Sequence, residues 1–463
     1  MFRKVNKIHF VGIGGIGMSG IAELLLNQGF EVSGSDIVKS EITNNLEQKG
    51  ATIHIGHQAS NLKKAEALVF SSAVSRDNVE LIRALEKKIP VIKRAEMLGE
   101  LIALKNTSIA IGGTHGKTST SSMIGALLSE ANLDPTLIVG GLVKNINSNS
   151  KLGLGDVVVV EADEYDKSFL QLRPTLAIIT NIEKEHMDCY RDIKDLKDSF
   201  AQFANSVPFY GSVILCDESK EILSIKDNIK KPITTYGLSS NSNVYARSIE
   251  FNMMKTTFML MHNDNECGRA TINVPGKHNV LNALAAAALG FELGLNDKTI
   301  LKGLNSYEGV RRRFELKGKV NDTLIIDDYA HHPTEVTATL EAAKNSWNKR
   351  LIAIFQPHLF SRTKDFYKDF ANSLSLSDIV IVTDIYPARE IPINGITGEL
   401  VYDELIRLGH KKTFYEPTMD RLPDLVSSIS KNNDMIITLG AGTIWRYAEK
   451  IVNNLKANHN YES

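Results

Sequence analysis

Short, nearly continuous apolar runs alternate with stretches of helical periodicity along most of the chain. Such runs are typical of buried parallel strands, and the stretches between them are typical of covering helices. The repeated strand–helix order predicts α/β sheets that bind ligands at the carboxyl ends of their strands. The predicted strands are residues 7–12, 31–36, 52–55, 67–71, 90–93, 108–111, 156–160, 176–180, 323–326, 350–355, 378–383 and 434–439.

The predicted elements fall into three groups. A helical stretch at 94–104 leads to a polar linker at 105–107, and a β-rich stretch at 233–274 with polar turns precedes an alanine-rich helix at 280–293. We therefore predict an α/β protein of three domains. They are an N-terminal Rossmann-like parallel sheet (1–106), a central P-loop ATPase-type α/β domain with a β-rich insertion (107–314) and a C-terminal Rossmann-like α/β domain (315–463).

Length and charge agree with this division. The chain has 463 residues, and domains average about 150 residues. Lys and Arg number 53 against 54 Asp and Glu, so the net charge favours neither nucleic acid nor an anionic membrane surface. The three scattered cysteines, together with the lack of a signal peptide or of about 18 consecutive apolar residues, predict a cytoplasmic protein.

Residues 112–120 read Gly-Gly-Thr-His-Gly-Lys-Thr-Ser-Thr between a predicted strand and a helical stretch at 123–130. Glycines let the backbone approach a polyphosphate, Lys117 supplies a cation, and the Thr118 hydroxyl suits Mg²⁺. Ile111 stands where the common P-loop has its first glycine, so the pattern is a tighter variant. The residues predicted to bind nucleotide phosphate are Gly113, Thr114, His115, Gly116, Lys117, Thr118 and Ser119.

A second glycine turn, 12–17, follows the first predicted strand, and Asp36 ends the next strand. This arrangement is typical of a loop that binds a pyrophosphate at a helix start and a ribose hydroxyl on the acid. It does not separate NAD from a UDP-sugar. Ser71 and Ser72 end another strand, where hydroxyl contacts to the same ligand and simple strand-end capping are equally good interpretations.

Carboxylates follow the strand at 156–160 directly. Glu161 comes first and is the best candidate ligand for Mg²⁺ near the phosphate loop, whereas Glu164 and Asp166 fit a solvated acidic loop better. His186 follows the strand at 176–180, which favours a role toward a metal or the γ-phosphate.

Polar side chains also gather at the start of the alanine-rich helix and beyond it. Asn279 and Asn282 share a helix face and suit a base or ribose, although capping of the helix by Asn279 is an equal alternative. A triple arginine at 311–313 at a domain junction is best explained as an anion clamp. Two further polar segments, 327–333 and 356–363, directly follow apolar strands.

Six ordered motifs make the chain resemble the Mur ligase family over essentially its whole length. They are residues 113–120, 161–164, 180–188, 276–282, 312–314 and 327–333. The resemblance implies a UDP-sugar domain (1–106), a central ATP-binding domain (107–314) and a C-terminal amino-acid-binding domain (315–463).

The resemblance also implies roles for residues that match the motifs. Lys117, His186 and Arg313 would be catalytic, and Thr118, Glu161 and His186 would hold one or two Mg²⁺ ions. ATP would also contact Asn279, Asn282, Arg313 and Asp328, and His331, His358 and Arg362 would face the amino acid. The UDP-sugar would contact Gly14, Gly15, Gly17, Met18, Ser19, Asp36, Ser71 and Ser72. Several relatives carry a carbamylated lysine after the histidine, but the corresponding stretch 199–203 here has none.

The implied activity is the ATP-dependent joining of L-alanine to the carboxylate of UDP-N-acetylmuramate through an acyl phosphate, in peptidoglycan precursor synthesis. Residues 12–20 are similar to the alanine-adding member and to the member that reattaches a recycled tripeptide, and 355–363 favour the former. A sibling ligase for another amine, a nicotinamide oxidoreductase and a non-catalytic nucleotide switch remain alternatives. The implied state is a monomer or a homodimer.

Overall fold

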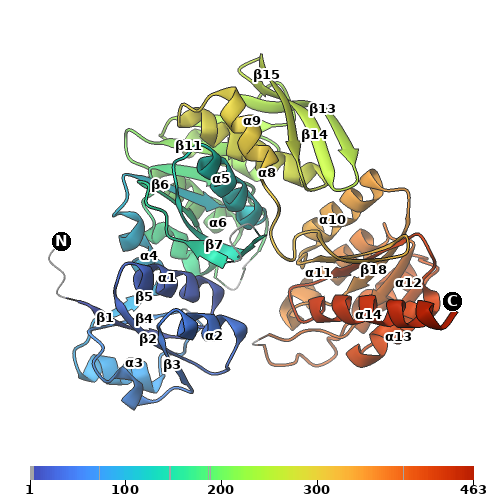
Figure 1. Ribbon diagram of the computed structural model, residues 1–463, viewed down its shortest axis with the longest axis horizontal. Helices are drawn as coiled ribbons and strands as arrows, with labels where there is room; N and C mark the ends of the chain where they lie inside the picture. Colours follow the sequence, from blue (N-terminus) through green and yellow to red (C-terminus); the bar gives the residue numbers. More distant parts are fainter. Residues whose placement is uncertain are drawn as a thin grey trace. The chain divides into compact units, whose positions relative to one another are not determined.

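The structure of this chain is a computed structural model (Figure 1). It describes residues 5–71, 73–144, 148–185, 187, 189–388 and 390–462, with side chains to residue 457. Three β-sheets are distributed over two compact units. Unit one comprises Met1–Ser248, Phe258–Ala270 and Leu281–Glu308, and unit two comprises Ile249–Thr257, Thr271–Val280 and Gly309–Ser463.

The first sheet, in unit one, has the strand order β3-β2-β1-β4-β5, and all of its pairs are parallel. The order reverses between β1 and β4, which is where ligands bind in open α/β sheets. The strands are β1 (Lys7–Val11), β2 (Glu31–Asp36), β3 (Thr52–Ile55), β4 (Ala67–Phe70) and β5 (Val91–Lys93). The helices are α1 (Ile16–Asn27), α2 (Glu41–Gln48), η1 (Ala59–Leu62), α3 (Val79–Glu86) and α4 (Arg94–Ile102).

The central sheet has ten strands in the order β15-β14-β13-β12-β11-β10-β6-β9-β7-β8. Its middle strands pair in parallel, and β7 and β8 form an antiparallel edge. Strands β6 (Thr107–Gly112), β7 (Thr136–Val143), β8 (Ser148–Lys151), β9 (Val157–Glu161), β10 (Leu176–Ile179) and β11 (Ser212–Cys216) form one part. Strands β12 (Ile233–Gly237), β13 (Val244–Asn252), β14 (Lys255–His262) and β15 (Asn265–Ile272) form the other. The predicted β-rich insertion is thus continuous with the central sheet.

Apolar residues on the covering helices form the core of the central region. The alanine-rich α8 is buried along most of its length because small side chains let it pack closely. The helices are α5 (Lys117–Glu130), η3 (Tyr165–Gln171), α6 (Ile193–Asn205), α7 (Lys220–Ile225), η4 (Lys226–Asn228), α8 (Lys277–Glu292) and α9 (Asp297–Asn305).

The third sheet, in unit two, has the order β16-β17-β21-β18-β19-β20, with only the β16–β17 pair antiparallel. Two apolar clusters pack on it, one of which includes Phe355 and Phe370 and the other Ile354 and Ile436. The strands are β16 (Glu315–Val320), β17 (Thr323–Asp328), β18 (Arg350–Phe355), β19 (Ile379–Val382), β20 (Thr413–Tyr415) and β21 (Asp434–Leu439). The helices are α10 (Pro333–Ser346), α11 (Phe360–Leu374), α12 (Glu399–Arg407), η5 (Met419–Arg421), α13 (Leu422–Ile429) and α14 (Trp445–Glu462).

The predicted α/β fold class is confirmed, with two differences in where helices begin. Helix α5 begins at Lys117, six residues before the predicted stretch, and α8 begins at Lys277. Serine and threonine dominate the first turns of α5, so apolar periodicity gives no signal there. The domain boundaries at residues 106 and 314 stay predictions. Within the described part of the chain, no helix is both long and apolar enough to cross a membrane.

Candidate active site

The turn between β6 and α5 has the backbone of a phosphate-binding loop. Gly113 has φ +134°, and a Cβ there would lie 2.0 Å from the Thr180 Oγ1 atom, so only glycine fits. Gly116 is the N-cap of α5 with φ +82°. The first amides of a helix have no carbonyl partner within that helix. The amides of Lys117, Thr118 and Ser119 are therefore directed at the mouth of the loop, where an anion binds well.

The end of β10 holds this loop in shape. The Thr114 amide donates to the Asn181 carbonyl (3.1 Å), and the His115 amide donates to the Asn181 Oδ1 atom (2.8 Å). The Thr180 hydroxyl donates to the His115 carbonyl (2.6 Å). Two of the amides predicted to face phosphate thus support the loop itself. The loop is preformed by Thr180 and Asn181, for which only the family resemblance provided a signal.

Lys117 forms an ion pair that the sequence pattern did not predict. Its ammonium lies 3.0 and 2.8 Å from the two carboxylate oxygens of Glu164, and it also donates to the carbonyls of Gly113 and Thr114. Burial alone would lower the pKa of Lys117, but the carboxylates of Glu164 and Asp163 outweigh that effect and raise it. Glu164 is only 2% exposed, so its interpretation as a solvated loop residue was wrong.

Glu161 ends β9 next to the phosphate loop, opposite Ile111 in the β6–β9 pair. Its carboxylate accepts a hydrogen bond from the Gly140 amide (2.6 Å). Thr118 lies in the first turn of α5. Two of the three candidate metal ligands, Thr118 and Glu161, thus lie at the carboxyl ends of adjacent strands or directly beyond them. The third, His186, lies outside the described residues.

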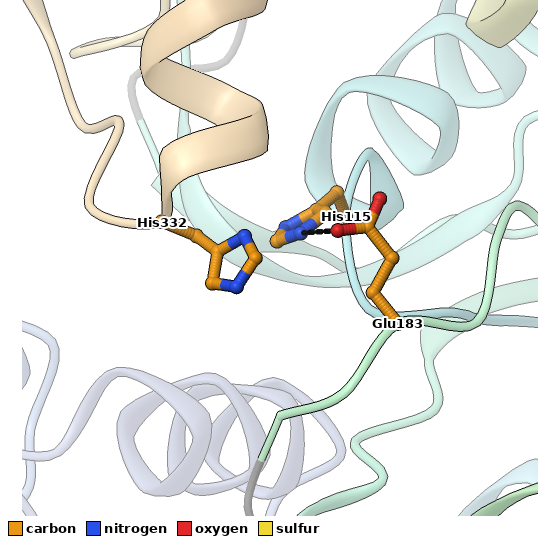
Figure 2. Close-up of side chains that lie close together, drawn as sticks. All are labelled: His115, Glu183 and His332. Atoms are coloured by element: carbon orange, nitrogen blue, oxygen red, sulfur yellow. Dashed lines mark ion pairs between the residues drawn. The ribbon is translucent and has the colours of Figure 1, made fainter. Parts of the chain in front are cut away.

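Two more side chains of the predicted ATP site, one in the loop and one on α8, have contacts in the structure. His115 pairs with Glu183, with 3.5 Å between Nε2 and Oε2 (Figure 2). The Asn282 Oδ1 atom accepts from the Thr120 hydroxyl (3.1 Å) and would lie 2.7 Å from a Cβ at Gly116. Helix α8 therefore packs its amide side chain directly on the turn.

Asn279 does not cap α8. The helix begins two residues earlier, at Lys277, and the Asn279 side-chain amide donates to the Pro275 carbonyl (2.7 Å). The capping alternative is therefore wrong, while a role toward a base or ribose stays a prediction.

The turn after β1 is the first glycine loop of unit one, and the turn after β6 is the second. The amides of Gly12 and Ile13 donate to the Ser35 carbonyl, and the Gly14 amide donates to the Asp36 Oδ2 atom (2.8 Å). Gly15 is the N-cap of α1. Asp36 thus braces the loop backbone in addition to its predicted contact with a ribose.

The other residues predicted to bind the UDP-sugar differ in accessibility. Met18 and Ser19 are buried, the Ser19 hydroxyl donates to the Ile16 carbonyl, and both backbone amides donate to the Gly15 carbonyl, so these groups are engaged within the protein. The Ser71 hydroxyl accepts from the Ala73 amide (3.3 Å), which is the capping contact that was weighed as an alternative. Ser72 lies outside the described residues.

Arg94 links this glycine loop to the acidic loop after β9. Its Nη1 atom would lie 2.8 Å from a Cβ at Gly17, and its Nη2 atom pairs with Asp163 (3.2 Å). No motif singled out Arg94, because its position depends on how α4 packs in the folded unit.

A fully buried carboxylate lies beneath the first sheet. Glu80, on α3, accepts hydrogen bonds from Ser35 (2.6 Å), His9 (3.2 Å) and Asn61 (2.6 Å). Burial alone would raise the pKa of Glu80, but these hydrogen bonds outweigh it and lower the pKa to about 2. Glu80 is thereby connected, through Ser35, to the first glycine loop.

Unit two has its own polar cluster at the ends of β17 and β18. Asp328 accepts from the amides of Phe314 (2.7 Å) and Ala330 (2.8 Å), and burial raises its pKa to about 6. The Arg313 guanidinium pairs with Glu335 (3.3 Å) and lies over the ring of Tyr329. Asp328 therefore orders the backbone beside Arg313.

The three residues predicted to face the amino acid lie together in unit two. The rings of His331 and His358 have centroids 5.9 Å apart. His358 stacks on Tyr386, and its Nδ1 atom lies 3.2 Å from the Arg362 Nη1 atom. Imidazole and guanidinium groups at strand ends suit a carboxylate ligand.

The fold and these loops define a class: a nucleotide-binding α/β protein with a P-loop-type central domain and a second, lysine-free glycine loop in its first domain. The chain matches three family descriptions in order. They are "Mur ligase family, catalytic domain" over residues 7–106, "Mur ligase middle domain" over 111–290 and "Mur ligase, glutamate ligase domain" over 312–442. The chain belongs to the Mur ligase family.

Curated relatives and solved structures show which members of the family this chain is most similar to among those compared. A UDP-N-acetylmuramate–L-alanine ligase of Geotalea daltonii is 47% identical over 98% of this chain and 99% of its own length. The enzyme of that name from Syntrophus aciditrophicus is 46% identical over 98% and 95%. The crystal structure of the UDP-N-acetylmuramate-alanine ligase of Thermotoga maritima has a TM-score of 0.84 at 29% identity, covering 98% of this chain and 99% of that one. A murein peptide ligase of Psychrobacter arcticus has a TM-score of 0.71 at 27% identity, covering 97% and 98%.

Proposed function

We propose that this chain is an ATP-dependent ligase that joins L-alanine to the carboxylate of UDP-N-acetylmuramate, a step of peptidoglycan precursor synthesis. The observation that carries the proposal is the conjunction of a lysine-bearing phosphate loop with full-length likeness to enzymes named for this reaction. The murein peptide ligase matches the same fold less well, so the sibling activity is the second candidate.

The chemistry follows from the substrates. An amine does not displace oxide from a carboxylate, so the acid must first be activated. The muramyl carboxylate attacks the γ-phosphorus of ATP, forming an acyl phosphate and releasing ADP. The amino group of alanine then attacks the acyl carbon, and phosphate leaves from the tetrahedral intermediate.

The residues of the central domain stabilise the first step. An anion attacks a polyanion, so positive charge around the transferring phosphoryl group lowers the barrier. The ammonium of Lys117 and the amides at the start of α5 supply that charge. Arg313 of unit two is proposed to add a second cation.

The side chains next to the loop fit Mg²⁺. Magnesium prefers hard oxygen ligands, and Thr118 and Glu161 offer a hydroxyl and a carboxylate. When bound there, the ion would neutralise charge on the ATP phosphates. His186 is proposed as a ligand of a second ion.

The other substrates are assigned to the remaining loops. We propose that the UDP-sugar binds at the glycine loop of the first sheet and at Asp36, with Arg94 as an added cation beside Gly17. The amino acid is proposed to bind at His331, His358 and Arg362 in unit two.

The decisive experiment measures ADP release with UDP-N-acetylmuramate across a panel of amines. We expect L-alanine to give the highest kcat/KM. A peptide as the preferred amine would replace the proposal with the sibling activity, and hydride transfer without ADP release would exclude both. With ¹⁸O in the muramyl carboxyl group, label is expected in the released phosphate, and its absence would exclude the acyl phosphate.

A further inference from the structure

The buried carboxylate of Glu164 has no role in the reaction described above, yet it contacts the phosphate-binding lysine. We propose that Glu164 is an internal competitor of the nucleotide: it holds Lys117 when the loop is empty, and the phosphates of ATP must displace it. The inference rests on the proposed assignment of this loop to ATP.

Lys117 has no free donor for a phosphate oxygen while Glu164 holds it. An ammonium group has three N–H donors and no acceptor. Four oxygens surround it, namely the carbonyls of Gly113 and Thr114 and both carboxylate oxygens of Glu164. All three donors are therefore engaged, and a phosphate oxygen gains one only when an existing partner lets go.

The carboxylates near Lys117 also repel a phosphate ligand. Glu164 is 2% exposed, and Asp163 and Glu185 also act on Lys117. Charges screened poorly by water interact strongly. A polyphosphate that approaches Lys117 thus meets the repulsion of a buried carboxylate as well as the attraction of the ammonium.

Of the two partners in this ion pair, Lys117 is the one that can move. The backbone at Glu164 is held by the Tyr190 hydroxyl, which donates to the Glu164 carbonyl (2.5 Å), and by the Lys167 amide (3.0 Å). The ammonium of Lys117, by contrast with the Glu164 backbone, is carried on a flexible four-carbon side chain. The lysine is therefore the part that swings toward phosphate, and it leaves a buried carboxylate behind. That unfavourable state subtracts from the affinity for any phosphate ligand.

The consequence is that every phosphate ligand binds more weakly, and a ligand with few other contacts then leaves the loop largely unoccupied. Inorganic polyphosphate gains only loop contacts, whereas ATP and ADP also gain contacts of the adenosine moiety that offset the loss of the ion pair. The structure thus assigns Glu164 a role in lowering the affinity of the loop for phosphate ligands rather than a role in the transfer step.

The test compares Glu164→Gln with Asp166→Asn, an exposed acid two residues along the same loop. Kd values for ADP and for inorganic tripolyphosphate are measured by calorimetry. Glu164→Gln is expected to bind ADP about tenfold more tightly, equivalent to about 1.4 kcal/mol, and to gain affinity for tripolyphosphate. Asp166→Asn is expected to bind both as the unmodified protein does. Unchanged or weaker ADP binding in Glu164→Gln would overturn the inference.

A double-mutant cycle shows whether the effect acts through the lysine. In a Lys117→Ala background, Glu164→Gln is expected to tighten ADP binding by much less than tenfold, because only the direct repulsion between carboxylate and phosphate is left to remove. An undiminished tenfold gain would overturn the inference. Should Glu164→Gln fail to fold, as judged by thermal unfolding, Glu164→Asp withdraws the carboxylate by one carbon and is expected to tighten ADP binding to a smaller degree; no tightening there would also overturn it.

The ligase assay separates this inference from the proposed function. At saturating ATP, Glu164→Gln is expected to form the alanine adduct. Loss of the ADP effect with retained amide formation counts against the inference alone, whereas absence of amide formation in the unmodified protein counts against the proposed function alone.

Discussion

The two glycine loops of unit one share a backbone design but differ in their chemistry. Each joins a buried parallel strand to a helix, and each ends at a glycine N-cap, Gly15 for α1 and Gly116 for α5. The loop after β1 carries no lysine, and its amide at Gly14 contacts Asp36. The loop after β6 carries Lys117 at the helix start. The proposed roles differ accordingly: the first loop is proposed to bind an anion, and the second is proposed also to stabilise charge that moves during phosphoryl transfer.

Each loop is also accompanied by a buried carboxylate, and the partners of that carboxylate decide its role. Glu80 is surrounded by hydrogen-bond donors from Ser35, His9 and Asn61, so its charge is compensated permanently by the fold. Glu164 depends on the ammonium of Lys117, a group that the proposed reaction requires elsewhere. The two carboxylates therefore differ in kind: Glu80 has partners that stay in place, whereas the partner of Glu164 is one that the proposed ligand also requires.

The largest effect is expected from Lys117→Ala. The substitution removes the positive charge that distinguishes the loop after β6 from the loop after β1. The kcat/KM for ADP formation is therefore expected to fall about a thousandfold. The Kd of UDP-N-acetylmuramate, measured by calorimetry, is expected to stay unchanged. Loss of both functions in a folded variant would contradict the separation of the two loops.

Glu80→Gln is expected to lower the free energy of unfolding by about 3 kcal/mol at pH 7, because it disrupts a fully buried carboxylate network. The stability contributed by a lowered pKa is complete above the ordinary value of 4.5 and is lost as the pH falls toward about 2. Urea unfolding between pH 7 and pH 3 therefore should show a steeper acid loss for the unmodified protein than for the variant. Glu86→Gln, an exposed pair on the same helix, is the control and is expected to change stability by less than about 0.5 kcal/mol. Equal effects of the two variants would show that Glu80 is not a structural carboxylate.

Substituting one glycine in each loop should show which loop binds ADP and which binds UDP-N-acetylmuramate. A Cβ at Gly113 meets the Thr180 hydroxyl at 2.0 Å, and one at Gly14 meets Asp36 at 2.9 Å. We expect Gly113→Ala to weaken ADP about thirtyfold and Gly14→Ala to weaken UDP-N-acetylmuramate about tenfold, each without affecting the other ligand. Gly29→Ala, with φ +84° and open space around it, controls for backbone strain and should leave both Kd values unchanged. If either substitution weakened the binding of both ligands, the two loops would share one ligand.

The smallest effect is expected in the metal titration of Glu161→Ala. Removal of one proposed carboxylate ligand should raise the Mg²⁺ concentration for half-maximal ADP formation about tenfold. Asp166→Asn, an exposed acid on the same loop, is the control and is expected to leave the titration unchanged. An unchanged titration would remove Glu161 from the metal site.

Much of the fold was predictable because its signals are local. Strands such as β18 and β21 are continuous apolar runs, and their bounds agree with the predicted ones. Strands β7, β8, β11, β16 and β20 were not predicted. Ser148–Lys151 is polar and Thr413–Tyr415 is too short to show a period, so no local pattern indicates β8 or β20. Strand β8 pairs with β7, which directly precedes it, whereas β20 pairs with β19 from beyond helix α12.

The site was predictable to a lesser extent, for the same reason. Lys117 and Glu161 each follow a strand within a recognisable motif, whereas Arg94 and Glu164 acquire their positions only from distant contacts. The interpretation of Glu164 failed because an acid in an acidic run is normally hydrated, whereas this one is buried, with its carboxylate on Lys117 and its backbone carbonyl bonded to Tyr190.

The sequence by itself determined the α/β class, the two glycine loops and the family, because hydrophobic period and glycine–lysine spacing act over a few residues. The tertiary structure alone decided which carboxylates are buried and what they pair with. Burial is a property of contacts between remote segments, and it sets whether a charge is hydrated, compensated or forced to compete. The partner of the phosphate-loop lysine, Glu164, was therefore visible only in the folded structure.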